Sequence, residues 1–391
     1  MSAAFDLVDI SLLTQKMELY GFDNHSLKWM NSYLSGRRQC VCIDGVLSKF
    51  QNVDTGVPQG SILGPLFYII FTNELPEVIH NHNENENSHN EHSYSLDCIK
   101  CGGLCCFADD STCSISDKDP KVICEKLETK YELISDYMSS NKLKLNSDKT
   151  HLMVMMTDQL RRRHQIDIKL NTKQEYIEPT ENEKMLGGII SQNLKWTDHI
   201  QNDKKSLIKN LTTRLNGLKK ISNLIDFRTR KMIVNGIFMS KLIYLIPLWG
   251  GCEKFLIKSL QVIQNKAART VTKLDRYTRT ETLLNQCNWL SVNQLVAFHS
   301  LTLVYKTLKH KSPKYLYKQL TGDSQCKYNT RFARNNSIGP RHPATNQISN
   351  RSFVFRASSQ WNNLPIDIQE AETLSKFKQS LKKWIKSNIP I

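Results

Sequence analysis

Two adjacent carboxylates, Asp109 and Asp110, directly follow an apolar run and directly precede a second strand-like segment, residues 111–115. This pattern predicts a β-hairpin with the acidic pair at its turn. Because neighbouring residues of a strand point to opposite faces, one carboxylate can face a bound metal while the other braces the site. An acidic turn in solvent is the alternative interpretation. The acidic pair alone does not distinguish a metal site from an acidic turn, and the motifs around it are needed to do so.

Charge is unevenly distributed along the 391 residues. Residues 201–391 contain 33 Lys and Arg against 9 Asp and Glu, whereas residues 1–200 contain 20 against 28. A strongly basic half repels itself unless a polyanion is present, so the asymmetry favours a metal-bearing first half and a second half that binds nucleic acid. A surface that only keeps the chain in solution is the alternative.

Hydrophobic periodicity also divides the chain. Up to about residue 200, helical and strand-like stretches are mixed, which predicts an α+β region. From residue 201 to about 320, leucines recur every three to four residues among lysines and arginines, which predicts a run of helices. The elements expected in the first region are two helices over 11–35, a strand pair over 37–57 with a turn at Asp44-Gly45, helices over 66–75 and 120–139, a strand over 151–156 and a hairpin near Gly187 and Gly188.

The remaining segments are less regular. Residues 80–95 are rich in Asn, His and Glu and can bury little apolar surface, so a disordered surface insertion is expected. Residues 321–352 are predicted to be a loop-rich linker to a C-terminal helix over 374–387. The tryptophans expected in the core are Trp249, Trp289 and Trp361.

Several classes of protein lack support. The chain has no cationic apolar leader and no stretch of the ~18 to 20 apolar residues that span a bilayer, so we expect an intracellular protein of the nucleus or cytoplasm without a membrane partner. Its eleven cysteines are expected to be reduced. The cluster of Cys98, Cys101, Cys105 and Cys106 favours core packing, and a zinc-binding adaptor is the weaker alternative. Motifs of ATPases, zincins and α/β-hydrolases do not occur.

Three motifs accompany the acidic pair in order along the chain. They are residues 4–9 (AFDLVD), residues 56–66 (GVPQGSILGPL) and residues 141–150 (NKLKLNSDKT). Together they resemble the palm motifs of a reverse transcriptase of the non-LTR (LINE, jockey-like) retrotransposon type, over most of the chain. The resemblance implies an α+β right-hand polymerase palm, partial and without fingers, over residues 1–200. It further implies a helical thumb and connector over 201–320, and a basic α-helical C-terminal region that includes the linker and helix of 321–391.

The resemblance also implies the chemistry of the acidic pair. Asp109 and Asp110 would hold two Mg²⁺ (or Mn²⁺) ions that clamp the attacking 3′-hydroxyl and the leaving pyrophosphate, and no zinc is expected. Lys149 matches a lysine proposed to protonate the departing pyrophosphate, with surface charge as the alternative. The implied partners are an RNA template, a DNA primer and dNTPs, while the oligomeric state is not predicted.

Other positions match binding motifs. Phe5 matches the aromatic residue that lies under the sugar of the incoming nucleotide and excludes a 2′-hydroxyl, although a core phenylalanine is the alternative. Gln59 and Gly60 fall where the family positions the templating base pair, because a glycine lets the backbone approach closely. The hairpin at Leu186, Gly187 and Gly188 resembles the one that grips the primer terminus.

One family position falls outside the sequence. The pattern Asp-x-x-x-Ala-Phe would place the first metal aspartate one residue before Met1, and neither Asp6 nor Asp9 is expected to replace it. The resemblance therefore implies an N-terminally truncated enzyme. The expected function is that of an RNA-directed DNA polymerase domain protein of retrotransposon origin, with an inactive nucleic-acid-binding remnant as the alternative.

Overall fold

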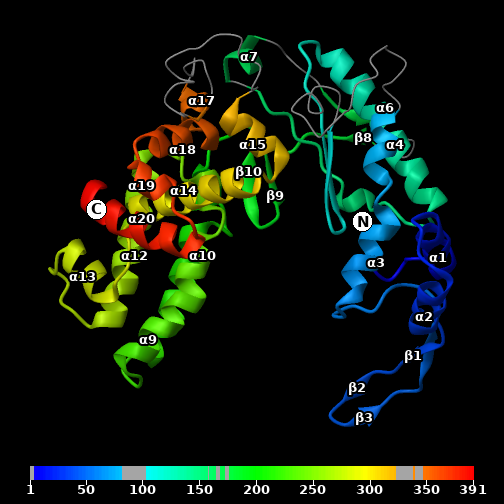
Figure 1. Cartoon of the computed structure of the whole chain (residues 1–391), viewed down its shortest axis with the longest axis horizontal. Helices are drawn as coiled ribbons and strands as arrows, with labels where there is room; N and C mark the ends of the chain where they lie inside the picture. The colour runs from blue at the N-terminus through cyan, green and yellow to red at the C-terminus, as the bar shows by residue number, and fades with distance from the viewer. Residues whose placement is uncertain are drawn as a thin grey trace. The chain divides into compact units, whose positions relative to one another are not determined.

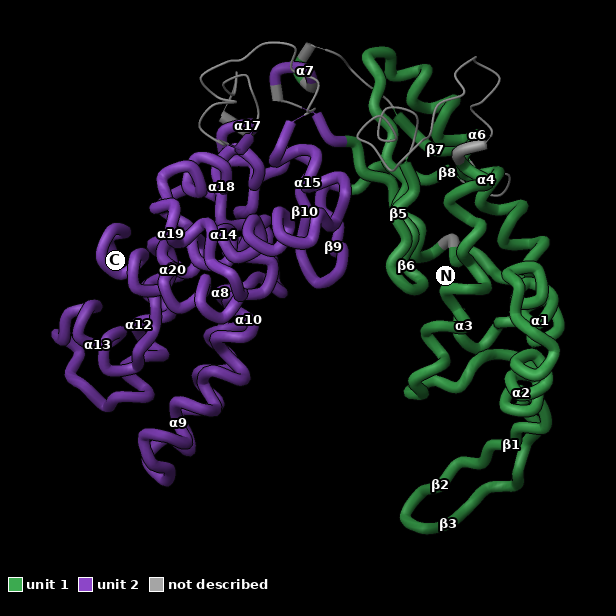
Figure 2. Tube along the Cα trace, viewed as in Figure 1, with its two compact units in different colours: residues 1–154, 161–180 green, residues 155–160, 181–391 purple. Residues whose placement is uncertain are grey.

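The computed structural model of the chain describes residues 4–81, 103–156, 158–163, 168–171, 176–322, 338–339 and 347–391. They form two compact units. Unit 1 comprises Met1–Val154 and Arg161–Thr180, and unit 2 comprises Met155–Leu160 and Glu181–Ile391 (Figure 2). Each unit has a hydrophobic core of its own. Among these described residues, no helix is both long enough and apolar enough to cross a bilayer.

Unit 1 begins with the two helices predicted over 11–35. They are α1 (Ile10–Leu19) and α2 (Asn24–Leu34). The Asp9 carboxylate caps α1 by accepting a hydrogen bond from the Leu12 amide, and Asp23 caps α2 in the same way. Gly21 lies between the two helices, where its φ of 84° ends the first of them.

The predicted strand pair over 37–57 is confirmed as a two-part hairpin. Strand β1 (Arg37–Gln39) pairs with β4 (Gln51–Val53), and β2 (Cys42–Ile43) pairs with β3 (Val46–Leu47). The turn lies at Asp44-Gly45, with φ values of 49° and 84°. Two successive positive φ angles are what a two-residue hairpin turn needs, which is why Asp-Gly predicted it.

The core of unit 1 is formed mainly by helices. These are α3 (Leu63–Thr72), α4 (Leu75–Asn81) and α6 (Pro120–Ser140), together with α1 (Figure 1). Helix α3 starts three residues before the predicted position, and its Phe67, Tyr68 and Phe71 are fully buried. The predicted insertion at 80–95 falls within α4 at its first two residues, and its other residues lie outside the described part.

The predicted acidic hairpin is confirmed by β5 (Gly103–Phe107) and β6 (Asp110–Ser114), joined through Ala108 and Asp109. The expectation that Cys105 and Cys106 are buried was wrong, because both are exposed. They pair with Thr112 and Ser111 in a sheet that has only these two strands among the described residues. Cys98 and Cys101 lie outside the described residues.

The predicted strand over 151–156 was also wrong. Only Leu152 forms a bridge, with Pro179. The apolar side chains of this segment pack beside Leu127 and Tyr131 of α6 instead of extending a sheet. The short elements nearby are η1 (Ser147–Lys149), α7 (Asp158–Arg163), β7 (Leu170–Asn171) and β8 (Tyr176–Ile177).

Unit 2 opens with a hairpin and continues as helices, as its sequence predicts. Strands β9 (Asn182–Met185) and β10 (Gly188–Ser191) enclose a two-residue turn at Leu186-Gly187. The helical elements up to residue 321 are η2 (Asp198–Asn202), α8 (Leu207–Ile221), α9 (Phe227–Val234), η3 (Asn235–Met239), α10 (Ser240–Ile243), α11 (Ile246–Trp249), α12 (Lys254–Thr272), α13 (Thr280–Cys287), α14 (Val292–His310) and α15 (Lys314–Thr321).

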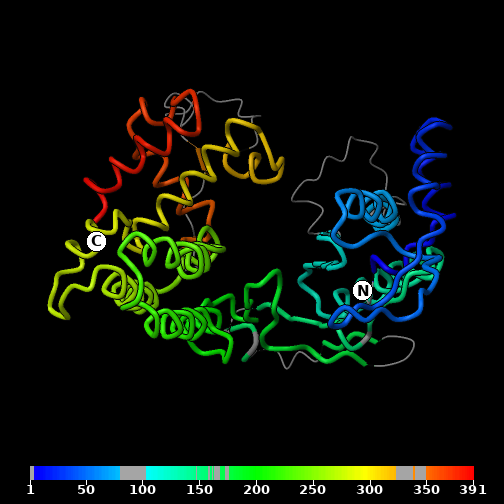
Figure 3. The backbone as a smooth tube through the Cα atoms, turned by 90° about the horizontal axis from the view of Figure 1, so that it is seen from below, coloured from blue at the N-terminus to red at the C-terminus, as the bar shows by residue number. Residues whose placement is uncertain are grey.

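The described C-terminal residues are also helical. Their helices are α17 (Gln347–Arg351), α18 (Phe353–Asn362), α19 (Ile366–Gln369) and α20 (Leu374–Asn388). Helix α20 lies along α14, as two views show (Figure 1, Figure 3). One continuous core runs from Ile200 to Ile385, and it buries Trp249, Trp289 and Trp361 as expected. Most of the predicted linker, residues 321–352, lies outside the described part.

Candidate active site

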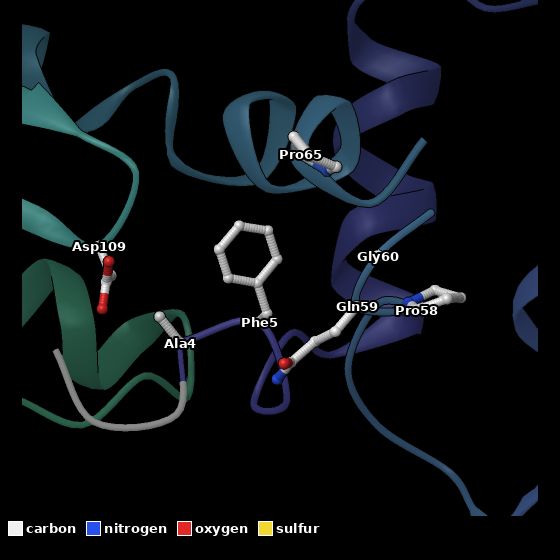
Figure 4. Close-up of a pocket in the computed structure, with 7 residues that line it drawn as sticks. All are labelled: Ala4, Phe5, Pro58, Gln59, Gly60, Pro65 and Asp109. Atoms are coloured by element: carbon white, nitrogen blue, oxygen red, sulfur yellow. The ribbon is translucent and has the colours of Figure 1, made fainter. Parts of the chain in front are cut away.

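A cavity of about 400 Å³ in unit 1 is lined by three segments that are distant in sequence. The segments contribute the lining residues Ala4, Phe5, Pro58, Gln59, Gly60, Pro65 and Asp109. In Figure 4 the Phe5 ring lies between the Asp109 side chain and Pro65, and Gln59 extends from the opposite wall. Four of the predicted site residues therefore meet at one cavity: Phe5, Gln59, Gly60 and Asp109.

Backbone hydrogen bonds hold the first two segments together. The Gly56 amide donates to the Val8 carbonyl at 2.7 Å, and the Val57 amide donates to the Phe5 carbonyl at 2.7 Å. Gly56 has a φ of 80°, and a Cβ there would lie 2.7 Å from the Asp6 Cα. Only glycine permits this approach. The Arg37 guanidinium also donates to the Thr55 carbonyl at 2.9 Å, which supports the segment from the other side.

The second segment is tied to the start of α3. The Ser61 hydroxyl donates to the Pro58 carbonyl at 2.8 Å and accepts from the Gly64 amide at 2.8 Å. A Cβ at Gly64 would lie 2.5 Å from the Pro58 oxygen, so packing requires a glycine there. Gly60, with a φ of 77°, has no heavy atom within 4 Å of the same position. Gly60 therefore leaves the mouth of the cavity open.

The side chain of Gln59 is oriented by Asp6. Its Nε2 donates to the Asp6 Oδ1 at 2.8 Å. Asp6 itself is held because its backbone carbonyl accepts from the Thr55 hydroxyl at 3.0 Å. This hydrogen bond turns the NH₂ group of the Gln59 amide toward the Asp6 carboxylate, so the amide oxygen of Gln59 is free to face another partner.

Phe5 rests on a buried tyrosine of α3. The Phe5 and Tyr68 rings are stacked, with centroids 4.8 Å apart and planes 24° apart. Tyr68 is fully buried and Phe5 is half-buried. Burial raises the pKa of the Tyr68 hydroxyl, and the negative charge of Asp109 raises it further. Phe5 is thus at once a neighbour of the core and a wall of the cavity.

The two carboxylates of the hairpin differ in placement. Asp109 occupies the turn after Ala108, whose φ is 51°, and it is half-buried at the cavity wall. Asp110 pairs with Phe107 as the first residue of β6, is exposed and does not line the cavity. The alternation expected from strand geometry thus separates the pair.

Asp109 suits a divalent metal by its chemistry, because Mg²⁺ prefers carboxylate oxygens and often takes only one or two from the protein, with the rest from substrate phosphates. Within the described ranges, no group of three or more His, Cys, Asp or Glu residues could hold a metal ion. The donors that fit are therefore Asp109 at the cavity and Asp110 beside it.

The other predicted site residues lie elsewhere. Lys149 ends η1 in unit 1, where its side chain is exposed and does not line the cavity. The hairpin of Leu186, Gly187 and Gly188 belongs to unit 2. The Tyr244 hydroxyl donates to the Leu186 carbonyl at 2.6 Å, so the turn is fixed to the bend between α10 and α11.

Sequence reasoning missed three residues that support the cavity: Asp9, Arg37 and Tyr68. Asp9 caps α1 and also pairs with Lys142, whose Nζ lies 2.6 Å from the Asp9 Oδ2. That hydrogen bond is the main reason why the pKa of Asp9 is lowered. An Asp directly before a helical pattern is a signal for a cap. Arg37 binds backbone carbonyls, for which no sequence pattern exists.

Comparison with known proteins assigns the family. A family model described as reverse transcriptase (RNA-dependent DNA polymerase) matches residues 1–201. The probable RNA-directed DNA polymerase from transposon X-element of Drosophila melanogaster is 25% identical over 292 residues, covering 72% of this chain and 29% of that protein. The probable RNA-directed DNA polymerase from transposon BS of the same species is 23% identical over 316 residues, which cover 80% of this chain and 32% of that protein. The RNA-directed DNA polymerase from mobile element jockey of Drosophila funebris is 25% identical over 254 residues, which cover 64% of this chain and 25% of that protein.

The chain therefore belongs to the reverse transcriptase family, and its origin is a retrotransposon of the non-LTR, jockey-like type, as the motifs predicted. It spans between a quarter and a third of the length of these relatives. Membership of the family implies a palm-type fold and dependence on a divalent metal. The helix-rich unit 1 and its small sheets are compatible with such a fold.

Proposed function

We propose that unit 1 carries the nucleotide and template side of the catalytic centre of an RNA-directed DNA polymerase. The observation that carries the proposal is the meeting of Phe5, Gln59, Gly60 and Asp109 around one cavity. These residues come from segments about fifty residues apart, and each matches a position of the family motifs. Such a reaction would place the protein in the nucleus or cytoplasm, where RNA templates and dNTPs occur.

Each side chain has a distinct part in the proposal. The flat Phe5 ring, supported by Tyr68, lies under the sugar and leaves no room for a 2′-hydroxyl. Gln59, oriented by Asp6, contacts the templating base pair, and Gly60 lets that pair approach the backbone. Asp109 and Asp110 would hold Mg²⁺ or Mn²⁺, which supplies positive charge to the 3′-hydroxyl and to the leaving pyrophosphate. Lys149, exposed on the same unit, is the proposed proton donor to that pyrophosphate.

The remaining regions are assigned by the same proposal. Residues 1–200 form the partial palm, 201–320 the thumb and connector, and 321–391 a linker with a C-terminal helix. The turn at Leu186, Gly187 and Gly188 holds the primer terminus, which the rigid attachment to Tyr244 supports. Basic side chains of 201–320 follow an RNA–DNA duplex by its backbone, independently of sequence.

Primer extension tests the proposal. The chain, extended at its N-terminus by a fingers segment and family-like residues that end in Asp-x-x-x-Ala4-Phe5, is given poly(rA) primed with oligo(dT), dTTP and Mg²⁺ or Mn²⁺, and is compared with its own Asp109→Asn variant. We expect the substitution to lower extension by roughly a thousandfold, because it removes a ligand on which transition-state stabilisation depends. Asp136→Asn is the matched control, since Asp136 is exposed on α6 and does not line the cavity. Extension that survives Asp109→Asn contradicts the proposal.

A further inference from the structure

Helix α20 carries a strong positive charge that the palm chemistry does not use. Its sequence, LSKFKQSLKKWIKSN, contains five lysines and no acidic residue. The apolar residues Phe377, Leu381 and Ile385 recur every four positions and are fully buried in the core of unit 2. The lysines Lys378, Lys382 and Lys386 recur with the same spacing, one position after each of them. They therefore form a single row along the helix.

A fourth lysine, Lys231 of α9, lies near the end of this row although it is distant in sequence. Lys382 Nζ lies 3.4 Å from the Asn288 carbonyl, and Lys386 Nζ lies 3.3 Å from the Asn288 Oδ1. Lys231 of α9 is close as well. Burial is the first cause that lowers the pKa of Lys382, and the charges of Lys386 and Lys231 lower it further.

The corner between α13 and α14 fixes this arrangement. Asn288 follows α13 with a φ of 52°, and the next residue, Trp289, donates its indole N–H to the Asn235 Oδ1 at 3.0 Å. Asn235 lies one helical turn after Lys231, so the bond holds Lys231 beside the corner. Both views place the C-terminal end of α20 next to the segment that joins α13 to α14 (Figure 1, Figure 3).

The positive charge of this α20 lysine cluster, meaning Lys231, Lys378, Lys382 and Lys386, is not neutralised by an ion pair within the described parts of the chain. The two hydrogen bonds to Asn288 are long, and each ammonium has three donors, so donors are left over. Four cations held together without an acid favour an anion with several charges.

The burial of the apolar face of α20 indicates which kind of anion the lysines bind. A basic amphipathic helix that binds a membrane inserts its apolar face into lipid. Here that face is occupied by the core, and Phe377, Leu381 and Ile385 have 0% exposure. The side of the helix that carries the lysines remains for a ligand, with Lys386 exposed and Lys378 and Lys382 half-buried. The row from Lys378 to Lys386 is about 12 Å long, at ~1.5 Å per residue. Over that length a duplex presents about seven phosphates.

We propose that Lys231, Lys378, Lys382 and Lys386 form a second site for a nucleic-acid backbone, separate from the cavity of unit 1 and indifferent to base sequence. The site gives the C-terminal helix a role in holding template or product. It does not depend on the proposed catalytic role of unit 1.

The experiment measures binding of the full chain to a fluorescein-labelled 20-base-pair RNA–DNA hybrid by anisotropy, between 50 and 300 mM NaCl. Lys382→Gln/Lys386→Gln is compared with Lys376→Gln/Lys383→Gln, which removes two charges from the same helix outside the row. We expect the first pair to lower the salt slope by about 1 to 2, because each lost phosphate contact removes about 0.9. The affinity at 100 mM NaCl should then fall about 10-fold or more, and the control pair should change it less than about threefold.

Lys382→Arg/Lys386→Arg should retain binding. Because the binding assay contains neither dNTP nor divalent metal, a failure here is distinguishable from a failure of the catalytic proposal. Equal losses in the two Gln pairs, or no loss in either, would overturn the proposal. A second measurement needs no variant: acetylation of wild-type lysines, read by mass spectrometry, should slow at least threefold at Lys231, Lys382 and Lys386 when the hybrid is bound. Unchanged acetylation there contradicts the site.

Discussion

The Phe5 ring lies flat on the Tyr68 ring, with centroids 4.8 Å apart and an angle of 24° between the planes. Because Tyr68 is fully buried in α3, the position of the cavity wall is set by the core of unit 1 and not by the loop that carries Phe5. This relationship makes Tyr68 a positioning residue for the proposed sugar contact.

The first prediction concerns sugar discrimination. Phe5→Val should raise the affinity for UTP relative to dTTP, since the ring that excludes the 2′-hydroxyl is gone. Tyr68→Phe should leave that ratio within about threefold of wild type, because it keeps the stacked ring that supports Phe5. Tyr68→Leu, which removes the ring, should shift the ratio toward Phe5→Val. Competition between the two nucleotides for the primed template complex measures the ratio, and identical ratios in all variants would contradict the assignment of Phe5.

A second prediction tests the close approach at Gly56. Gly56→Ala should destabilise unit 1 by about 2 kcal/mol or more, because the residue has a positive φ and its Cβ would meet the Asp6 backbone. Gly217→Ala is the matched control: it lies within α8, has nothing within 4 Å, and should stabilise unit 2 slightly. Urea unfolding, with a probe in each unit, distinguishes the two. If Gly56→Ala leaves the free energy of unfolding of unit 1 unchanged, the segments of Asp6 and Gly56 can move apart without cost.

Acid stability tests the pairing of Asp9 with Lys142. The pKa of Asp9 is lowered below 3.8 in the folded state, so its contribution is present above the unfolded pKa and is lost as the pH falls through the folded one. Lys142 is 65% exposed, so the pair itself is worth only about 0 to 1 kcal/mol. Asp9→Ala, which also removes the cap of α1, should cost about 1 kcal/mol more. The loss should become smaller as the pH falls through the lowered folded pKa of Asp9, and a loss that stays constant as the pH falls would contradict the electrostatic part.

His199 should give unit 2 a different pH dependence. Its Nδ1 accepts from the Ile189 amide at 3.2 Å, and burial, with a smaller effect of Lys241, lowers its pKa to about 4 from 6.5. The unfolded chain therefore binds a proton first, so stability is complete above pH 6.5 and falls by about 3 kcal/mol as the pH drops to 4.

Removing the imidazole isolates this effect. His199→Asn should reduce the pH dependence of the stability of unit 2 between pH 6.5 and 4, although it lowers stability at neutral pH. A part should remain, because burial also lowers the pKa of His299 in α14. His310→Asn, at the exposed end of α14, is the control and should keep the slope. Urea midpoints measured at several pH values provide the test, and a slope unchanged in His199→Asn would assign the pH dependence to other groups.

Short-range signals in the sequence were sufficient for much of the fold. Asp44-Gly45 predicted its hairpin because the turn needs two positive φ angles, and both residues have them. The segments around Phe5, Gln59 and Asp109 could be placed together because motif order identified a family. The strand expected at 151–156 failed because an apolar run can pack on a helix as well as in a sheet, and Leu152 does so beside α6.

Longer-range relationships were not predictable from residue types. Cys105 and Cys106 were expected to be buried as small residues in an apolar run, yet burial depends on whether other elements cover the strand. Lys149 matches its motif but is exposed away from the cavity lining. The support of Phe5 by Tyr68 joins residues 63 positions apart, and no local pattern encodes such a contact.

The most direct test of the central claim is to locate the bound nucleotide. 4-Thio-dUTP is cross-linked by light to the chain on primed poly(rA) with Mn²⁺, and labelled peptides are identified by mass spectrometry. The account predicts label in the peptides that contain Phe5 or Gln59, loss of label with excess dTTP, and a decrease of about 10-fold in Asp109→Asn but not in Asp136→Asn. Label confined to other peptides, or label that Asp109→Asn leaves unchanged, would contradict it.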